Sequence, residues 1–248
     1  MRVQACISSR AGQGAAGGAP LRRSAVLRRA GGGAAWLAAT GGLALAAAAA
    51  ASARGAGGGD AQSLVRRGMD KFRRGDVEGS VEDFDAALAA DPRLRPYLWQ
   101  RGLSLYYTGE FEQGAKQFRD DVAVNPNDTE ESIWALLCEA QLVGPEAARA
   151  QVLAVGRDPR PVMRAAWQCF ATGRDPDAIL AAARGDAGGH DTFYAQLYVG
   201  LWHEAHGDAE RARAAITAAV ETPYARQSGD YMAALARVHA QRRGWAAA

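Results

Sequence analysis

Apolar residues recur at helical spacing through most of the chain after residue 60. One face of the segment 77–90 is marked by four apolar residues, each three or four positions from the next: Val77, Val81, Phe84 and Leu88. Asp91 and Pro92 end this segment, because proline cannot continue a helix. The same reasoning predicts further helices over 61–73, 99–107, 111–124, 147–155, 163–170, 175–184 and 230–243, one beginning after Asp128, and a hairpin over 193–221. The fold class is therefore expected to be all-α.

Two successive segments share residues at an interval of 34 positions. Gly68, Gly75, Phe84 and Pro92 of the first segment correspond to Gly102, Gly109, Phe118 and Pro126 of the second. Near the end of the chain, Gly200, Gly207, Ala212 and Ala219 have the same spacing as Gly68, Gly75, Ser80 and Ala87. In each copy the first glycine lets a partner helix approach, and the second ends the helix.

This period and residue set resemble the tetratricopeptide (TPR) helical hairpin. The resemblance implies that residues 61–226 form a TPR solenoid of about five hairpins. Residues 227–248 are expected to supply a C-terminal capping helix, because the last repeat would otherwise expose its stacking face.

The N-terminal part has the composition of a disordered or helical targeting segment. The first 59 residues contain no Asp or Glu and seven of the 29 basic residues. Arg28 and Arg29 precede an apolar run over 34–52, and Ala51 and Ala53 fit a small-x-small cleavage pattern. We expect 1–53 to be a bipartite chloroplast transit and thylakoid lumen signal, followed by a linker over 54–60. A retained membrane anchor is the alternative for the apolar run, and stroma or mitochondrion are the alternative destinations.

Removal of the leader changes the charge balance. Residues 1–53 carry six of the 29 basic residues, which leaves 23 basic against 27 acidic residues, a net charge of −4. A nucleic-acid partner is therefore not expected. The two cysteines left, Cys138 and Cys169, fit either a disulfide or two buried apolar side chains.

The inner wall of a TPR solenoid is lined by the first helix of each hairpin, and a protein or peptide partner is expected to bind in this concave groove. Aromatic and apolar residues are frequent at these positions, and such residues are common anchors at interfaces. The candidate groove residues are Val65, Met69, Phe72, Trp99, Leu103, Tyr106, Tyr107, Tyr194, Leu197 and Leu201.

The sequence contains no motif that predicts catalysis. The string GQGAAG over 12–17 matches the dinucleotide-binding pattern, but no apolar strand precedes it and it lies in the predicted leader. Walker loops, nucleophile elbows and zinc spacings do not occur, so no catalytic residue, metal ligand or cofactor is assigned. His203 and His206 are interpreted as surface residues near the turn at Gly207, and the acidic pairs 120–121 and 130–131 as solvated faces and helix starts.

The stretch 101–142 resembles the NlpI-type family of bacterial TPR lipoproteins. The segment from Pro126 to Trp134 is not general TPR consensus, and a second similar patch covers 193–220. The matching residues of the first patch are Arg101, Gly102, Leu105, Tyr106, Tyr107, Gly109, Pro126, Asn127, Asp128, Ser132, Trp134 and Glu139. The resemblance implies a homodimeric adaptor that presents substrates to a carboxyl-terminal processing protease. Residues 222–245 are similar to chloroplast TPR proteins of unassigned role.

Together these patterns favour a non-enzymatic TPR scaffold or adaptor in the thylakoid lumen. It would hold partner proteins during assembly or quality control of photosynthetic complexes. The alternatives are an adaptor for a processing protease and, from another class, an enzyme whose site the sequence does not reveal.

Overall fold

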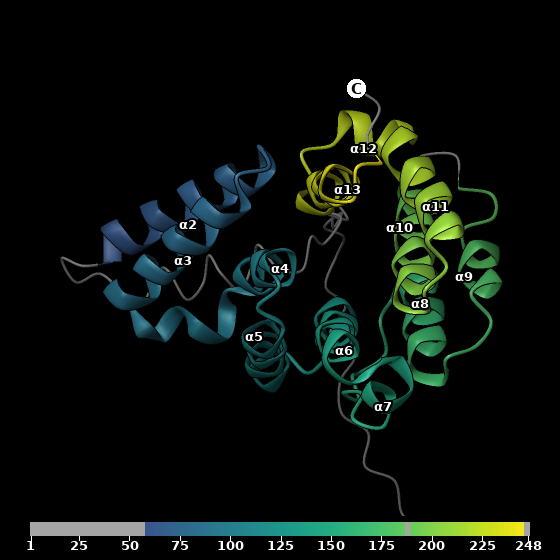
Figure 1. Cartoon of the computed structure of the whole chain (residues 1–248), viewed down its shortest axis with the longest axis horizontal. Coiled ribbons are helices and arrows are strands. Elements are labelled where there is room, and N and C mark those ends of the chain that lie inside the picture. The colour runs from purple at the N-terminus through teal and green to yellow at the C-terminus, as the bar shows by residue number, and fades with distance from the viewer. Residues whose placement is uncertain (1–57, 187–188, 246–248) are drawn as a thin grey trace, which may run out of the picture. The chain divides into compact units, whose positions relative to one another are not determined.

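The computed structural model describes residues 58–186 and 189–245, and these residues contain helices and no strands. Consecutive helices pack antiparallel as hairpins along the chain (Figure 1). The α-helices are α2 (Gly58–Arg73), α3 (Val77–Ala90), α4 (Trp99–Thr108), α5 (Phe111–Val124), α6 (Thr129–Val143), α7 (Pro145–Arg149), α8 (Pro161–Thr172), α9 (Asp177–Ala182), α10 (His190–Ala205), α11 (Ala209–Glu221), α12 (Pro223–Gln227) and α13 (Tyr231–Arg242), and a 3-10 helix, η1 (Pro92–Tyr97), precedes α4. The prediction of an all-α fold is confirmed.

The repeated glycines stand where two helices of a hairpin cross. A Cβ atom at Gly68 would lie 2.9 Å from the Phe84 ring, and one at Gly102 would lie 2.6 Å from the Phe118 ring. Gly200 has the same relation to Ile216, at 2.7 Å. The second glycine of the first two copies ends its helix with a positive φ, +84° at Gly75 and +83° at Gly109. The hairpins α2–α3, α4–α5 and α10–α11 therefore use the same crossing.

Aspartates begin several of the helices. The Asp76 carboxylate accepts a hydrogen bond from the backbone N–H of Gly79 at 3.0 Å, and Asp128 accepts from Glu130 and Glu131. Asp208 and Asp230 cap α11 and α13 in the same way. Because a side-chain cap satisfies backbone donors that have no partner inside the helix, these residues fix where each helix starts.

The helix predicted over 147–155 is wrong. Only Pro145–Arg149 is helical there, and residues 152–158 have no regular structure. The Leu153 carbonyl accepts a hydrogen bond from the Ser132 hydroxyl at 2.7 Å, and the Gly156 N–H donates to the Pro126 carbonyl at 2.9 Å. These backbone groups bond to the preceding hairpin, so tertiary contacts override the local helical pattern.

The C-terminal helix has a larger role than its position in the sequence indicates. α13 begins at Tyr231, close to the expected start at 230, and packs against the two helices that precede it in the sequence, α11 and α12. It also packs against α2, at the other end of the described chain (Figure 1). One hydrophobic cluster consequently includes buried residues from Phe72 of α2 to Ala240 of α13.

We predict that Gly102→Ala lowers the free energy of unfolding by about 1–3 kcal/mol, because the added methyl group overlaps the buried Phe118 ring. Urea unfolding measures the change. Gly59→Ala is the control, since no atom lies within 4 Å of a Cβ there, and it should not destabilise the protein. Equal stability of Gly102→Ala and the unmodified protein would show that the two helices do not cross this closely.

Candidate functional site

The expected groove residues lie on α2, α4 and α10, and most of them have little exposed surface. Val65, Met69 and Trp99 are half-buried. The other seven are at most 8% exposed: Phe72, Leu103, Tyr106, Tyr107, Tyr194, Leu197 and Leu201. The structure thus places these residues largely in the core that the hairpins share, with three of them reaching solvent.

Helix α13 covers part of this face with an aromatic residue. The Tyr231 ring stacks on Phe72 with ring centroids 5.2 Å apart and meets Trp99 edge-on at 5.3 Å. The Arg73 guanidinium lies 5.3 Å from the centre of the same ring. Two polar atoms at this contact, Trp99 Nε1 and Tyr231 Oη, are buried and have no hydrogen-bond partner. Aromatic packing therefore stabilises the docked helix, while the unsatisfied donors oppose it.

A second contact of α13 is a buried His–Glu–Tyr group. His239 is fully buried; its Nδ1 lies 3.0 Å from Tyr107 Oη, and its Nε2 lies 3.2 Å from Glu204 Oε2. Burial opposes the charge of Glu204, but His239 and Arg243 more than offset it and lower the pKa of this carboxyl. Burial raises the pKa of the Tyr107 hydroxyl well above its ordinary value. The group joins α4, α10 and α13, and no pattern in the sequence singled out His239 or Glu204.

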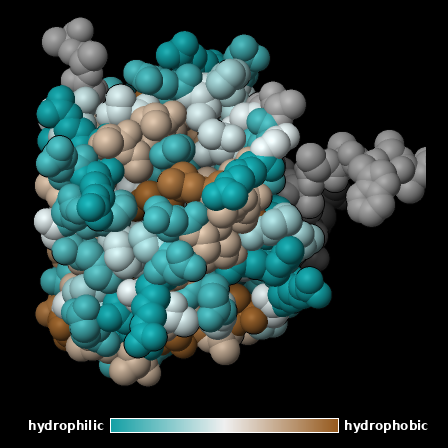
Figure 2. Space-filling model, turned by 90° about the vertical axis from the view of Figure 1, so that its right-hand side faces the viewer, coloured by the Kyte–Doolittle hydropathy of each residue, from teal (hydrophilic) through white to brown (hydrophobic). Residues whose placement is uncertain are grey.

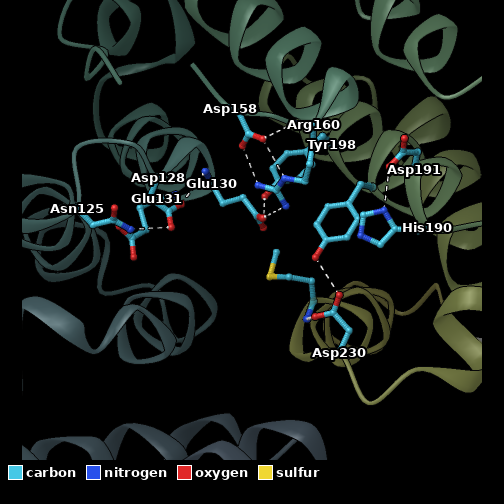
Figure 3. Close-up of polar contacts among 12 residues, drawn as sticks. Asn125, Asp128, Glu130, Glu131, Asp158, Arg160, His190, Asp191, Tyr198 and Asp230 are labelled. Atoms are coloured by element: carbon cyan, nitrogen blue, oxygen red, sulfur yellow. Dashed lines mark hydrogen bonds and ion pairs between the residues drawn. The ribbon is translucent and has the colours of Figure 1, made fainter. Parts of the chain in front are cut away.

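A polar network connects the start of α6 with α10 (Figure 3). Glu130 accepts hydrogen bonds from Arg160 Nη1 at 2.8 Å and from Tyr198 Oη at 3.0 Å. Arg160 also donates from Nη2 to Asp158 Oδ2 at 2.8 Å. Burial raises the pKa of Glu130 even though Arg160 acts in the opposite direction. The guanidinium is shared by two carboxylates, so it links α6 to the irregular segment before α8.

The network continues to α13 through Asp230 (Figure 3). Its Oδ2 accepts from Tyr194 Oη at 2.9 Å and from Tyr224 Oη at 2.7 Å, while its Oδ1 caps α13. The Arg160 guanidinium lies 5.6 Å from the centre of the Tyr194 ring. This contact joins the Glu130 part of the network to the Asp230 part. Tyr194, a predicted groove residue, therefore bonds to the C-terminal segment. The acids described here already have tyrosine or arginine partners, so their geometry supports a role in holding helices together.

Two acids that were expected to be solvated are buried. Asp121 is 1% exposed and Glu131 is 8% exposed, and one carboxyl oxygen of each has no hydrogen-bond partner. Burial, with nearby acids adding to it, raises the pKa of Asp121 to about 8 and that of Glu131 to about 10. The interpretation of both pairs as wholly solvated faces is wrong, whereas the start of α6 near Glu131 is confirmed.

His203 of α10 and His206, which follows the end of this helix, differ from each other. His206 stacks on Trp202 with ring centroids 3.9 Å apart, and its Nε2 lies 3.3 Å from Arg149 Nη1. His203 is only 8% exposed, so its interpretation as a surface residue is wrong. Within residues 58–186 and 189–245, no group of three or more His, Cys, Asp or Glu side chains has the geometry of a metal site.

Both described cysteines are buried free thiols, at 0% exposure for Cys138 and 2% for Cys169. Their side chains belong to the main hydrophobic cluster, on α6 and α8. Burial raises the pKa of the Cys169 thiol to about 12, which disfavours the reactive thiolate. The sequence left open either a disulfide or two buried apolar side chains, and the structure shows the second.

The surface is mixed in polarity. On the face shown in Figure 2, small hydrophobic patches are separated by hydrophilic residues. Among the described residues, the large apolar side chains classed as exposed are Val124, Leu142 and Val143. No helix in the described part of the chain is both long and apolar enough to cross a membrane. Arg28, Arg29, Ala51 and Ala53, the predicted targeting residues, lie outside the described residues.

We predict that stability falls as the pH rises from 5 to 9. Glu131 keeps its proton up to a pH of about 10 in the folded protein but loses it near its ordinary pKa of 4.5 when unfolded, so rising pH favours unfolding across this interval. Glu131→Gln removes this ionisation and should make the protein more stable than the unmodified chain at pH 9, by about 2 kcal/mol in urea unfolding. Glu112→Gln, at an exposed position of α5, is the control. The same slope in all three proteins would contradict the burial of a neutral acid here.

We also predict that His239→Ala loosens α13. Loss of the buried imidazole leaves a cavity and an unpaired Tyr107 hydroxyl, while Glu204 keeps only Arg243 as a partner. The free energy of unfolding should therefore fall by about 2–4 kcal/mol, and the α13 amides should exchange faster with deuterium. Tyr107→Phe, which removes only the hydroxyl, should cost about 1 kcal/mol. Gln241→Ala, at an exposed position of α13, serves as control. Unchanged amide exchange in His239→Ala would show that this group does not hold the helix.

A comparison of the chain with models of known protein families finds no match. The TPR assignment therefore stays a prediction from the repeat spacing, and the resemblance to NlpI-type lipoproteins stays a resemblance.

Proposed function

We propose that this protein is a non-enzymatic helical-repeat scaffold that holds partner polypeptides. The observation that carries this proposal is the common crossing of three hairpins, in which Gly68, Gly102 and Gly200 each meet a large side chain sixteen positions later in the chain. Hairpins that repeat one crossing form arrays, and such arrays commonly bind extended polypeptides along their surfaces.

The partner site that we favour is the part of the first-helix face left partly open. Val65 and Met69 of α2 pack with Leu94 against the small cluster of Phe84, Leu88 and Leu98, and all three packing residues are only half-buried. We call Val65, Met69 and Leu94 the α2 patch. A flexible methionine at an apolar surface adapts to side chains of different shapes, which suits a scaffold with several clients.

The compartment belongs to the same proposal. The acid-free leader with Arg28, Arg29 and the small-x-small pattern supports the thylakoid lumen, where the protein would act in assembly or quality control of photosynthetic complexes. An adaptor for a processing protease is the narrower form of this function, and it depends on the resemblance of residues 101–142 to NlpI-type proteins.

Selection of peptides from a displayed random library tests the proposal. Peptides selected on the full-length chain should bind with micromolar dissociation constants, equivalent to about 8 kcal/mol. The double substitution Val65→Ser with Met69→Ser should weaken this binding about tenfold, as measured by fluorescence anisotropy, because it removes the apolar contact of the α2 patch.

The matched control is Leu142→Ser with Val143→Ser, which replaces two apolar residues of α6 that are 41% and 58% exposed. This variant should bind the peptides as the unmodified protein does. Failure to select any peptide would contradict the scaffold, and loss of binding in the control alone would place the partner site on α6.

A further inference from the structure

A small pocket lies where α11, α12 and α13 meet. It has a volume of about 400 Å³ and is lined by Val220, Glu221, Ala225, Arg226, Ser228 and Arg237. Both arginines are exposed, and among the described residues neither forms an ion pair. The one hydrogen bond of these two guanidiniums runs from Arg237 Nη1 to the Ala225 carbonyl at 2.9 Å. The pocket therefore offers two cations without an anionic partner.

We propose that this pocket binds the C-terminal carboxylate of a partner polypeptide, a specific form of the scaffold function on which it rests. Guanidinium groups match the geometry of a carboxylate and bond to it through paired N–H donors. Val220 and Ala225 provide an apolar wall beside them. A chain end with a small apolar last residue offers a carboxylate to the arginines and an apolar side chain to this wall. Binding of a terminal carboxylate is a recurrent mode of peptide recognition.

The size and charge of the pocket favour this ligand over others. Its volume is near the lower end of the range for small-ligand sites, about 300–1,000 Å³, so it suits one or two residues of a chain end. With Arg226, Arg237 and Glu221, the lining has a net charge of +1. A single carboxylate neutralises this charge, and the apolar wall of Val220 and Ala225 favours a chain end over inorganic phosphate, which has no apolar part.

The pocket is separate from the α2 patch. Arg237 belongs to α13, and its bond to Ala225 joins α13 to α12, so Arg226 and Arg237 line one pocket only while α13 packs on α12. A bound chain end would therefore stabilise the docked form of this helix, because a ligand stabilises the state to which it binds.

A fluorescein-labelled peptide ending in Ala-Val tests the proposal, with either a free carboxylate or a C-terminal amide. In anisotropy titrations of the full-length chain, the free carboxylate should bind at least tenfold more tightly than the amide. Arg226→Ala should weaken binding of the free carboxylate about tenfold, and within the described residues the Arg226 side chain forms no hydrogen bond or ion pair whose loss would destabilise the fold. Glu221→Gln should strengthen it a few-fold, because it removes the repulsive charge.

Arg213→Ala is the matched control, since it removes an exposed arginine of α11 that does not line the pocket. Equal binding of carboxylate and amide, or the same small effect of Arg226→Ala and Arg213→Ala, would overturn the proposal. Displacement of the peptide by inorganic phosphate at equal affinity would overturn the preference for a chain end. If library peptides bind at the α2 patch while the carboxylate gives no advantage, the pocket is refuted and the scaffold function stands.

Discussion

The close crossing of two helices at a glycine is the constraint on which the described structure depends. Where Phe118 covers Gly102, the axes approach more closely than any side chain on the first helix would permit. The ring itself is 1% exposed, so it is held on all sides and cannot make room for a methyl group. At this crossing, one face of each first helix packs against the second helix of the same hairpin. The opposite face of the first helix can then pack against other helices of the chain.

Helix α13 takes much of that remaining surface. Its Tyr231 ring rests on Phe72 and Trp99, and His239 enters the core between Tyr107 and Glu204. An external peptide would therefore have to displace a helix whose inner residues are buried, or bind beside it. Two unsatisfied donors at the contact reduce the cost of displacement, but burial of a large apolar surface outweighs them. The half-buried α2 patch is consequently the more accessible surface for a partner.

Helices whose ends are marked by nearby glycine and proline residues were predicted accurately from the sequence. α3 and α5 have the predicted bounds, because a glycine precedes each helix and an Asp-Pro or Asn-Pro pair follows it. The segment after α7 was predicted poorly, since its backbone bonds to residues more than twenty positions away, such as Ser132. Local periodicity has no information about such partners.

The candidate site was harder to predict for the same reason. Tyr107 and His239 are 132 positions apart in the chain, and nothing in either segment indicates that they meet. The burial of Glu131 was also missed, because an acid in the first turn of a helix is usually solvated and favoured there by the helix dipole. In contrast, the residues expected in the groove lie on α2, α4 and α10, the helices that the glycine spacing identifies directly, and their role as a groove stays a prediction.

The two proposed binding surfaces are coupled only when a partner displaces α13. A partner that displaced α13 from α12 as well as from α2 would separate Arg237 from Ala225 and remove the pocket, whereas a chain end bound beside Arg226 and Arg237 would oppose that displacement. The coupling is reciprocal, since each ligand shifts the same equilibrium of α13 in proportion to its preference for one form. Binding at the α2 patch without displacement leaves the pocket intact. One client could then bind the pocket with its chain end and the α2 patch with another segment. The second contact would form within the complex already made by the first, so the two together would bind more tightly than either alone.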